Sequence, residues 1–496
     1  MGQPVRLEPG RWAEVRAPCR RAAEAGLTRW QTGLLVVLGL LSVSLWLGGH
    51  LFPVLRVGVG AAILVLTTVR IAACLTPCLE GPVPAPGRGD QVWPVYTVIL
   101  ALYREAAIVP QLLAAIEGLD YPRYRLQVIA ALELDDAATI AACRRYGRRL
   151  GLQLAFAEGP EPRTKPRALN AALAQALGDL VVVYDAEDRP HPGQLREAAM
   201  AFARGGAGLA VLQSPLRVRV PPGAPEIARQ FALEYAALFE VLLPFLTRLG
   251  WPFPLGGTSN HLRRSVLDAV GGWDPWNVTE DADLGFLLAA RGYRAGMLRL
   301  PTVETPTPAI RPWLTQRSRW LKGHMQTLGV HSRAPAVLGW RGAASLVLCL
   351  GCGIAAAALH GPMLALLVLD LIHGGIGGEA SGILPYDLLV LGSGWGSAAL
   401  CMAVGAGRTG SPARWTSLGL AAMFWPLQTL ALLRALWQLR FCPHHWDKTE
   451  HAPDAIPAAT PRPLDGMAES GLSGAGEPVP SPSRPRRHDP AHRAVG

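Results

Sequence analysis

Long apolar segments stand on both sides of a more polar central region, and this arrangement limits the possible folds more than any other feature. Residues 32–50 and 53–76 precede the central region, and residues 343–372, 383–404 and 415–439 follow it. A run of about 20 apolar residues is long enough to cross a bilayer as a helix. The composition, with 50% hydrophobic and only 17% charged residues, also favours an integral membrane protein.

The C-terminal apolar segments leave the number of membrane spans open. Residues 343–372 fit either one long helix or two short helices broken at Gly361-Pro362. Three full spans after the central region would put the basic segment 440–448 outside, against the positive-inside rule. We therefore expect one stretch to be split, re-entrant or interfacial.

Basic residues indicate the orientation. Residues 1–30 carry six arginines, so the positive-inside rule places this N-terminus in the cytoplasm and predicts a transmembrane hairpin over 31–78. The segment 53–76 contains two arginines, Arg56 and Arg70, whose side chains can extend toward the membrane surface. The net charge of +10 does not predict nucleic-acid binding, because the arginines lie in the tails and beside apolar segments rather than in a basic stripe with aromatics.

The central region, residues 91–335, alternates between strand and helix patterns. Strands are expected at 95–103, 126–134, 152–157 and 180–186, and helices at 107–118, 136–150 and 165–177. Such alternation predicts a parallel sheet with helices on its faces, whose ligands bind at the carboxyl ends of the strands. A Pro/Gly-rich linker over 81–89 precedes this region. C-terminal helices are expected within 340–440, and residues 451–496 have the composition of a disordered tail.

An acidic run follows the last of these strands: Asp185, Glu187 and Asp188. Two or three carboxylates at a strand end can hold a hard divalent cation, which in turn can clamp a diphosphate. The alternative is a solvated loop whose acids cap a helix. Whether Glu187 or Asp188 would be the second metal ligand stays open.

Two further clusters lie on predicted helices. Thr279-Glu280-Asp281 begins one helix, where Asp281 is a candidate general base and Thr279 is alternatively an N-cap. Residues 316–320, Gln-Arg-Ser-Arg-Trp, lie on a helix expected over 312–328. Its arginines can neutralise a diphosphate, and its tryptophan can stack on a sugar; the alternative is an interfacial helix anchored by Arg and Trp.

Smaller signals complete the set. The Gly256–Asn260 loop lets backbone approach a substrate closely, and Lys165 at a helix N-terminus is a natural phosphate contact. The cysteines predict no disulfide framework, and Cys349 and Cys352 stand in an apolar stretch without a second pair to complete a zinc site.

In this order, the motifs resemble those of the membrane-bound, family 2 inverting glycosyltransferases, a group of cellulose-synthase-like and hyaluronan-synthase-like bacterial exopolysaccharide synthases. The resemblance extends over about residues 30–450 and includes Trp446–His451. Arg104 stands where asparagine is usual, and Glu133 where aspartate is usual. The matching motifs are Tyr103-Arg104-Glu105, Glu133 with Asp136, Thr164-Lys165, Asp185–Asp188, Gly256–Asn260, Thr279–Asp281 and Gln316–Trp320.

The resemblance implies an α/β, GT-A-like (Rossmann-like) cytoplasmic domain inserted between N- and C-terminal transmembrane helices of a bacterial inner membrane. It implies a processive, inverting β-glycosyltransferase that uses a nucleotide sugar, expected to be a UDP-sugar, with Mg²⁺ or Mn²⁺. The implied partners are this donor, a growing glycan acceptor, the lipid bilayer and accessory export subunits, without nucleic acid.

The resemblance also assigns roles to residues. Asp281, with Glu280, would be catalytic, and Asp185 with Glu187 or Asp188 would bind the metal. Trp320, Gly257 and Thr258 would contact the acceptor. The nucleotide sugar would be bound by Tyr103, Glu105, Glu133, Lys165, Gln316, Arg317 and Arg319.

Two other functions stay open. One is a non-processive transferase that glycosylates a lipid with the same core, and the other is a non-catalytic export component on a decayed transferase fold. The intact Asp185, Asp281 and Trp320 favour an enzyme.

Overall fold

The computed structural model describes residues 23–24, 26–77, 92–157, 162–377, 385–410 and 414–448. The expected linker over 81–89, the expected disordered tail over 451–496 and most of the basic N-terminus lie outside these residues. We describe the unit that contains the sheet and the apolar helices, which ends at Asp454.

Seven strands form one mostly parallel sheet in the order β3-β2-β1-β4-β8-β6-β9, in which β8 alone is antiparallel to both neighbours. The four strands expected from the sequence are confirmed, with ends that differ by at most two residues. The strands are β1 (Tyr96–Ala101), β2 (Leu126–Glu133), β3 (Gln153–Ala157), β4 (Leu180–Tyr184), β6 (Leu209–Gln213), β8 (Asn260–Arg263) and β9 (Arg294–Met297).

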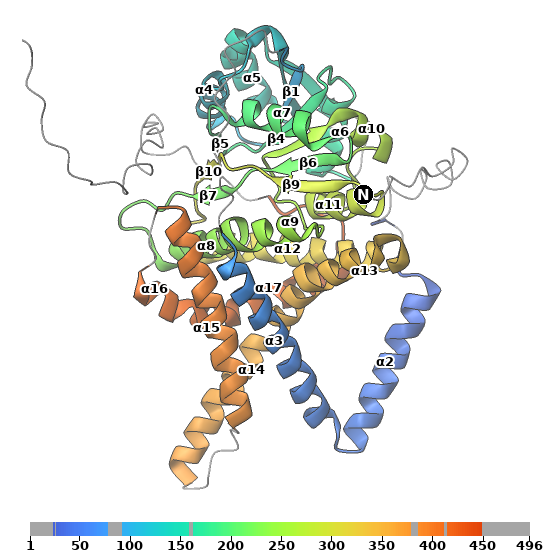
Figure 1. Cartoon of the computed structure of the whole chain (residues 1–496), viewed down its shortest axis with the longest axis vertical. Helices are drawn as coiled ribbons and strands as arrows, with labels where there is room; N and C mark the ends of the chain where they lie inside the picture. The colour runs from blue at the N-terminus through green and yellow to red at the C-terminus, as the bar shows by residue number, and fades with distance from the viewer. Residues whose placement is uncertain are drawn as a thin grey trace, which may run out of the picture. The chain divides into compact units, whose positions relative to one another are not determined.

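Helices cover both faces of this sheet (Figure 1). Successive residues of a strand point to opposite faces, so Ile99 of β1 packs into one core while Val98 and Leu100 pack into the other. Burial on both faces explains why the central strands read as nearly continuous apolar runs. One face carries α4 (Val109–Glu117), α5 (Ala137–Tyr146) and α7 (Gln194–Gly205); the other carries α6 (Lys165–Leu173), α10 (Arg264–Val270) and α11 (Glu280–Ala290).

A small second sheet lies beside the acidic run. Its strands are β5 (Arg189–Pro190), β10 (Thr302–Glu304) and β7 (Leu216–Val218), in that order. Because β5 directly follows the acidic run, its pairing with β10 brings the chain near residue 304 to the same place.

A layer of helices separates the sheet from the apolar helices in Figure 1. It contains α8 (Glu226–Ala237), α9 (Leu243–Leu249), α12 (Ile310–His331) and α13 (Pro335–Leu346), and a π-helical turn over Leu238–Leu242 joins α8 to α9. The stretch Glu226–Leu249 is apolar enough to cross a membrane, but 61% of it is buried in the protein. Burial of this extent is typical of a helix packed between two layers rather than one facing lipid.

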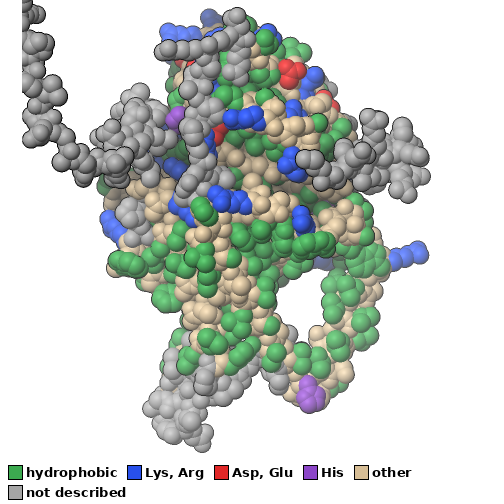
Figure 2. Space-filling view, viewed as in Figure 1, with side chains coloured by type: hydrophobic (Ala, Val, Ile, Leu, Met, Phe, Trp, Pro, Cys, Tyr) green, Lys and Arg blue, Asp and Glu red, His purple; other side chains and the backbone are tan. Residues whose placement is uncertain are grey.

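The remaining apolar helices extend away from the sheet, and hydrophobic side chains cover that part of the surface (Figure 2). Within the described residues, six stretches are long and apolar enough to span a membrane, including Glu226–Leu249. Helix α14 continues through Pro362, so the alternative of two short helices broken at Gly361-Pro362 is not observed. These helices are α2 (Arg29–Leu47), α3 (Leu51–Leu75), α14 (Cys352–Gly377), α15 (Pro385–Arg408), α16 (Trp415–Leu420) and α17 (Trp425–Phe441).

The C-terminal segment 442–448 returns to the sheet-containing domain. Lys448 Nζ lies 2.9 Å from Glu105 Oε1, at the carboxyl end of β1. The start and the end of the C-terminal helical region, α12 and residue 442, therefore both lie against this domain. Helices α14 and α15 extend away from the domain and back toward it (Figure 1), and α17 packs beside α12, where Arg434 donates to Thr315 Oγ1 at 2.9 Å. This arrangement favours an interfacial α16–α17 and two C-terminal spans.

Candidate active site

The carboxyl ends of β1, β2 and β4 meet at one edge of the sheet. Because β2 and β4 lie on opposite sides of β1, this edge is a topological switch point, where open α/β sheets bind ligands. Tyr103 and Glu105 follow β1, Glu133 ends β2, and Asp185 follows β4. All four line a single cavity of about 450 Å³, a volume in the range of small-molecule sites.

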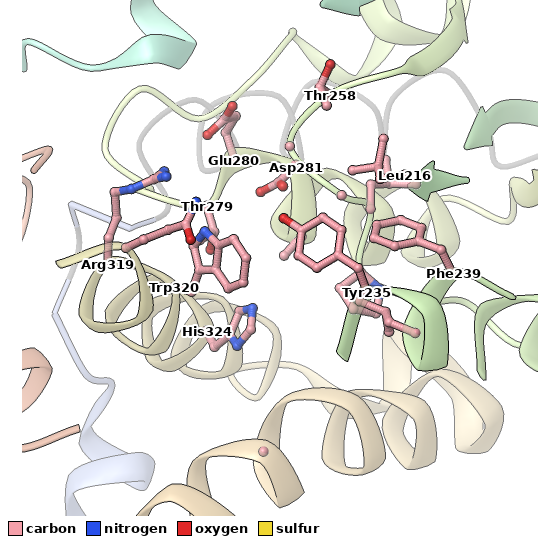
Figure 3. Close-up of a pocket in the computed structure, with 18 of the residues that line it drawn as sticks. Leu216, Tyr235, Phe239, Thr258, Thr279, Glu280, Asp281, Arg319, Trp320 and His324 are labelled. Atoms are coloured by element: carbon pink, nitrogen blue, oxygen red, sulfur yellow. The ribbon is translucent and has the colours of Figure 1, made fainter. Parts of the chain in front are cut away.

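Three charged side chains from distant parts of the chain surround Gly257. A Cβ atom built on this glycine would lie 3.4 Å from Asp281 Oδ2 and 3.9 Å from both Asp185 Oδ2 and Lys165 Nζ. In Figure 3, Glu280 and Asp281 lie above a space bounded by Trp320 on one side and Tyr235 on the other. The absence of a side chain at position 257 keeps this space open.

Lys165 begins α6 and carries a charge inside the site. Its Nζ lies 2.6 Å from Asp185 Oδ1 and 3.8 Å from Glu280 Oε1, and it donates to the Gly257 carbonyl at 2.6 Å. Burial alone would lower the pKa of Lys165, but Asp185 and Glu280 outweigh burial, and the pKa is raised above its usual value. Lys165 therefore stays positively charged, as a phosphate contact requires.

Helix α11 begins with the two acids Glu280 and Asp281. Thr279 is its N-cap residue, but the Thr279 side chain makes no capping hydrogen bond, so the capping interpretation is not supported. Burial, the largest effect, and the neighbouring Asp281 together raise the pKa of Glu280 to about 8, against the lowering effect of Lys165. Burial also raises the pKa of Asp281, which Lys165 and Arg319 oppose. Glu280 thus holds its proton at neutral pH more readily than an ordinary glutamate.

The acidic run splits into two kinds of environment. Asp185 and Glu187 line the cavity. Asp188 is only 1% exposed and turns back, accepting hydrogen bonds from the Asp185 backbone N–H at 2.7 Å and from the Thr258 hydroxyl. Asp188 therefore stabilises the loop. The Thr258 hydroxyl takes part in the same stabilisation, and Thr258 also lines the cavity.

Glu304 joins this group of carboxylates, and sequence reasoning missed it. It is buried at the end of β10 and lines the cavity. Burial raises the pKa of Glu304 well above its usual value, and Asp188, Glu187 and Asp185 raise it further. No motif in the sequence identified Glu304 as a site residue, because only the pairing of β10 with β5 brings Glu304 to the cavity.

The residues present suit a divalent cation whose coordination is completed by diphosphate oxygens. The Asp188 Oδ1 atom is buried without a hydrogen-bond partner, and four carboxylates repel one another here. Among the described residues, no three His, Cys, Asp or Glu side chains already converge as a full ligand set. Magnesium is commonly held by one or two carboxylates together with phosphate oxygens, so Asp185 and Glu187 are sufficient protein ligands.

Helix α12 presents only part of the Gln316–Trp320 motif to the cavity. Gln316, Arg319 and Trp320 line it. Arg317 does not: it pairs with Glu234 of α8, and its guanidinium carbon lies 4.5 Å from the Trp320 ring centroid. Residues two apart on a helix point about 200° apart, which separates Arg317 from Arg319. The expected contact of Arg317 with the nucleotide sugar is thus not supported by its position.

Aromatic rings form the wall beside Asp281. The Trp320 ring lies 6.1 Å from that of Tyr235, centroid to centroid, and the two planes are inclined by 32°. Phe239 extends the same wall (Figure 3). Tyr235 and Phe239 belong to the α8 region, which carried no motif that marked it in the sequence.

The C-terminal segment closes the cavity at the carboxyl end of β1. Lys448 pairs with Glu105, and the Trp446 ring lies 6.4 Å from that of Tyr103. Glu133 is paired with Arg167. The segment 446–448 belongs to the part of the sequence that resembles family 2 glycosyltransferases. Its contact with the carboxyl end of β1 could not be predicted from the sequence and is seen only in the structure.

The cavity continues from Trp320 into the apolar helices. Ile63, Leu66 and Arg70 line it from one face of α3, because they are spaced by three and four residues. Cys352, Ala356 and His360 line it from one face of α14, again four residues apart. The same cavity therefore contains Asp281 and reaches between membrane helices.

Comparison with known proteins places the chain in a family. Residues 180–433, just over half of the chain, match the family described as "Glycosyl transferase family group 2", and residues 97–259 match "Glycosyl transferase family 2".

Curated relatives match about half of this chain. The beta-monoglucosyldiacylglycerol synthase of Synechocystis sp. is 29% identical over 238 residues, 47% of this chain and 48% of that protein. The cellulose synthase 1 catalytic subunit [UDP-forming] of Komagataeibacter xylinus is 25% identical over 264 residues, 52% of this chain and 34% of that protein. The chain thus spans between a third and about half of the length of these relatives.

Among solved structures, a mannosyltransferase from Pyrobaculum calidifontis in complex with GDP-Man and Mn²⁺ is 21% identical, with a TM-score of 0.47 and coverage of 77% of this chain and 99% of that one. The GT-A-like fold class and the flanking apolar helices expected from the sequence are confirmed. The chain belongs to glycosyltransferase family 2, and six stretches of its described residues are long and apolar enough to span a membrane.

Proposed function

We propose that this enzyme transfers a sugar from a nucleotide sugar to the end of a growing glycan, with inversion at the anomeric carbon, and that the glycan leaves between the membrane helices. One observation carries the proposal. A single cavity runs from Tyr103 and Glu105, past Asp185 and Asp281, to Trp320 and onward between α3 and α14. Donor site, base and exit then follow one another along one path.

The donor would lie at the carboxyl ends of β1, β2 and β4. Tyr103, Glu105 and Glu133 would contact the nucleoside, a UDP-sugar being the expected donor, and Lys165 and Arg319 the diphosphate. Asp185 and Glu187 would hold Mg²⁺ or Mn²⁺. When bound, this cation neutralises diphosphate charge and makes it a better leaving group.

Asp281 would act as the general base. Its carboxylate borders the space next to Gly257, where an acceptor hydroxyl can approach the anomeric carbon from the face opposite the diphosphate. Removal of the hydroxyl proton by Asp281 would accompany formation of the new glycosidic bond and departure of the nucleoside diphosphate. Attack from the opposite face inverts the anomeric configuration.

A polymer product is supported by what lies beyond the acceptor position. Trp320 offers a flat ring on which a terminal sugar can stack, and the cavity does not end there. Relatives of the chain include the cellulose synthase subunit and a poly-beta-1,6-N-acetyl-D-glucosamine synthase of Staphylococcus aureus. We place the catalytic domain in the cytoplasm and the spans in the bacterial inner membrane, with export subunits as possible partners.

The test uses the full-length protein in lipid nanodiscs, radiolabelled nucleotide sugars, and Mg²⁺ or Mn²⁺. We expect one sugar to enter a high-molecular-weight product, and Asp281→Asn to lower its transfer by about 10²-fold or more, with nucleotide affinity retained. Asp268→Asn, a surface aspartate on α10, is the matched control. Equal turnover in Asp281→Asn and the wild type would rule out the base assignment.

A second function is favoured by the apolar lining of the inner cavity, which includes Leu242, Phe245 and Leu348. Such a surface suits an acyl or prenyl chain, and one relative is named a beta-monoglucosyldiacylglycerol synthase. In that case the radiolabel would extract into chloroform–methanol as a small glycolipid, and no polymer would form. Product size and partitioning thus distinguish the two functions.

A further inference from the structure

The charged residues of the cavity are unevenly distributed. Its carboxylates all lie on the sheet side, near the donor site. Past Trp320, the described residues that line the cavity include no aspartate or glutamate. They are mainly aliphatic, apart from Arg70 of α3, His360 of α14 and His324 of α12. Burial lowers the pKa of His324 to about 4, so this imidazole is neutral and Arg70 is the permanent cation of that part of the lining.

Arg70 is poorly satisfied for an arginine among apolar helices. Its guanidinium donates one hydrogen bond, to the Gly394 carbonyl of α15, at 3.3 Å, and it forms no ion pair with a described carboxylate. Arg408 of α15 provides the contrast, because it donates to the carbonyls of Glu240, Cys74 and Thr76. A half-buried cation among apolar helices without an anionic partner is unfavourable, which indicates that Arg70 has a partner during function.

The position of Arg70 does not fit a side chain that extends to the membrane surface. Cys74 and Cys401 are level with each other, since their sulfurs lie 3.3 Å apart, and this marks the domain end of α3 and α15. Arg70 is one turn further from that end, and it reaches Gly394, seven residues before Cys401. Side chains on a helix also tilt toward its N-terminus, here away from the domain. The guanidinium therefore stays inside the helix bundle, facing the cavity.

His360 lies near Arg70 on the facing helix. Its ring stacks on Trp425 with the centroids 4.4 Å apart and the planes inclined by 27°, which holds the imidazole in place. A neutral imidazole can donate one hydrogen bond beside the several N–H groups of the guanidinium. Carboxylate and phosphate oxygens are the groups that such donors bind best.

We propose that Arg70, assisted by His360, forms an anion-binding site in the membrane part of the cavity, and that it binds a carboxylate or phosphate carried by the acceptor. The inference rests on the proposed function, because it requires the acceptor to occupy this cavity. The anion has two possible sources: a uronic acid within the glycan, or the phosphate of a lipid-linked acceptor.

The experiment measures binding rather than turnover. Wild type, Arg70→Gln, Arg70→Lys and Arg440→Gln are placed in nanodiscs, the last being an exposed arginine of α17 that serves as the matched control. Affinities are measured for two probe pairs: a glucuronate-containing tetrasaccharide against cellotetraose, and farnesyl phosphate against farnesol. The ratio of affinities within a pair does not depend on how much of a variant is folded.

We expect the anionic member of at least one pair to bind wild type about tenfold or more tightly than its uncharged analogue, the effect of a hydrogen bond to a charged group. Arg70→Gln should reduce this ratio to near one, while Arg70→Lys and Arg440→Gln keep it. Preference within the saccharide pair identifies a uronate, preference within the farnesyl pair identifies a phosphate, and preference within both identifies the shared anion chemistry.

Two results would overturn the inference: equal binding of charged and uncharged probes by the wild type, or an unchanged ratio in Arg70→Gln. Failure of the proposed function looks different. A wild type that prefers the anionic probes but transfers no sugar from any nucleotide sugar would contradict the transferase proposal alone.

Discussion

At the residue scale, neighbouring acids of this site differ because their surroundings differ. Asp185 and Glu187 face the cavity, whereas Asp188 is buried and accepts hydrogen bonds from the Asp185 N–H and the Thr258 hydroxyl. A carboxylate that faces the cavity is available to a cation, and one that holds two buried donors stabilises the loop. Three acidic residues within a run of four can thus serve two purposes.

This difference predicts separate effects for two substitutions. Glu187→Gln should raise the Mn²⁺ concentration needed for half-maximal activity by about tenfold or more, without a change in Tm. Asp188→Ala removes the acceptor of the Asp185 N–H and of the Thr258 hydroxyl. It leaves them only contacts of 3.3 Å, to Thr258 Oγ1 and to the Val183 carbonyl respectively, which costs about 1 kcal/mol and should lower Tm. Metal titration and thermal unfolding of both variants check this. If Glu187→Gln needed no more Mn²⁺ than wild type and Asp188→Ala needed more, Asp188 rather than Glu187 would be the metal ligand.

The raised pKa of Glu280 predicts a pH dependence of stability. Its pKa is about 8 in the folded protein, against 4.5 ordinarily, with burial as the main cause. Between these values the folded state holds a proton that the unfolded state releases, so the free energy of unfolding falls as pH rises from about 5 to 8. Glu280→Gln should remove this dependence. The Tm of the variant relative to that of the wild type should therefore rise as the pH increases. Parallel pH–Tm curves would contradict the assignment; Asp268→Asn serves as the control.

At the element scale, the packing of α12 against the start of α11 positions Glu280 and Asp281, the acids that we propose to be catalytic. Gly323 of α12 lies against the side chain of Thr279, and a Cβ atom there would overlap the Thr279 hydroxyl. The close approach brings Trp320, one turn earlier on α12, beside Asp281 (Figure 3). A glycine inside this helix therefore sets the distance between two functional residues.

Gly323→Ala should push α11 and α12 apart and lower transfer by about 10- to 10²-fold, since small displacements of reacting groups are costly. Gly329→Ala is the matched control on the same helix, because a Cβ atom at that position meets nothing within 4 Å. Activity assays and Tm of the two variants provide the measurement. Full activity in Gly323→Ala would show that the contact does not position the site.

At the scale of the whole molecule, the return of residues 442–448 to the sheet-containing domain bears on the topology. Trp446 and Lys448 contact residues of this domain, from which we infer that both ends of the C-terminal helical region lie on the same side of the membrane. Two crossings, α14 and α15, satisfy this requirement, and the basic residues near 440–448 then stay on the positive-inside side.

Reporter fusions test this topology. Fusions of alkaline phosphatase after Gly377, the end of α14, should be active, because the inferred topology puts that point outside. Fusions of green fluorescent protein after Gly410 and after Lys448 should both fluoresce in the cytoplasm. Phosphatase activity after Lys448 would mean that α16–α17 crosses the bilayer.

The sequence by itself determined those features that depend on local pattern. Nearly continuous apolar runs such as Leu180–Val183 identified the central strands, because a strand covered on both faces excludes polar residues. Motif order, from Asp185 to Asp281 and Trp320, identified the family. It also indicated the edge of the sheet at which the site forms, since the carboxyl ends of parallel strands meet there.

Only the tertiary structure decided the features that depend on contacts between distant residues. The positions of Glu304 and Tyr235 in the site, the pairing of Arg317 with Glu234, and the burial of Asp188 all follow from packing between elements far apart in the chain. The same holds for Arg70, which the sequence left as an arginine able to extend to the membrane surface and the fold turned toward the cavity. A side chain's environment is a property of the neighbours that folding brings to it, and local sequence does not specify those neighbours.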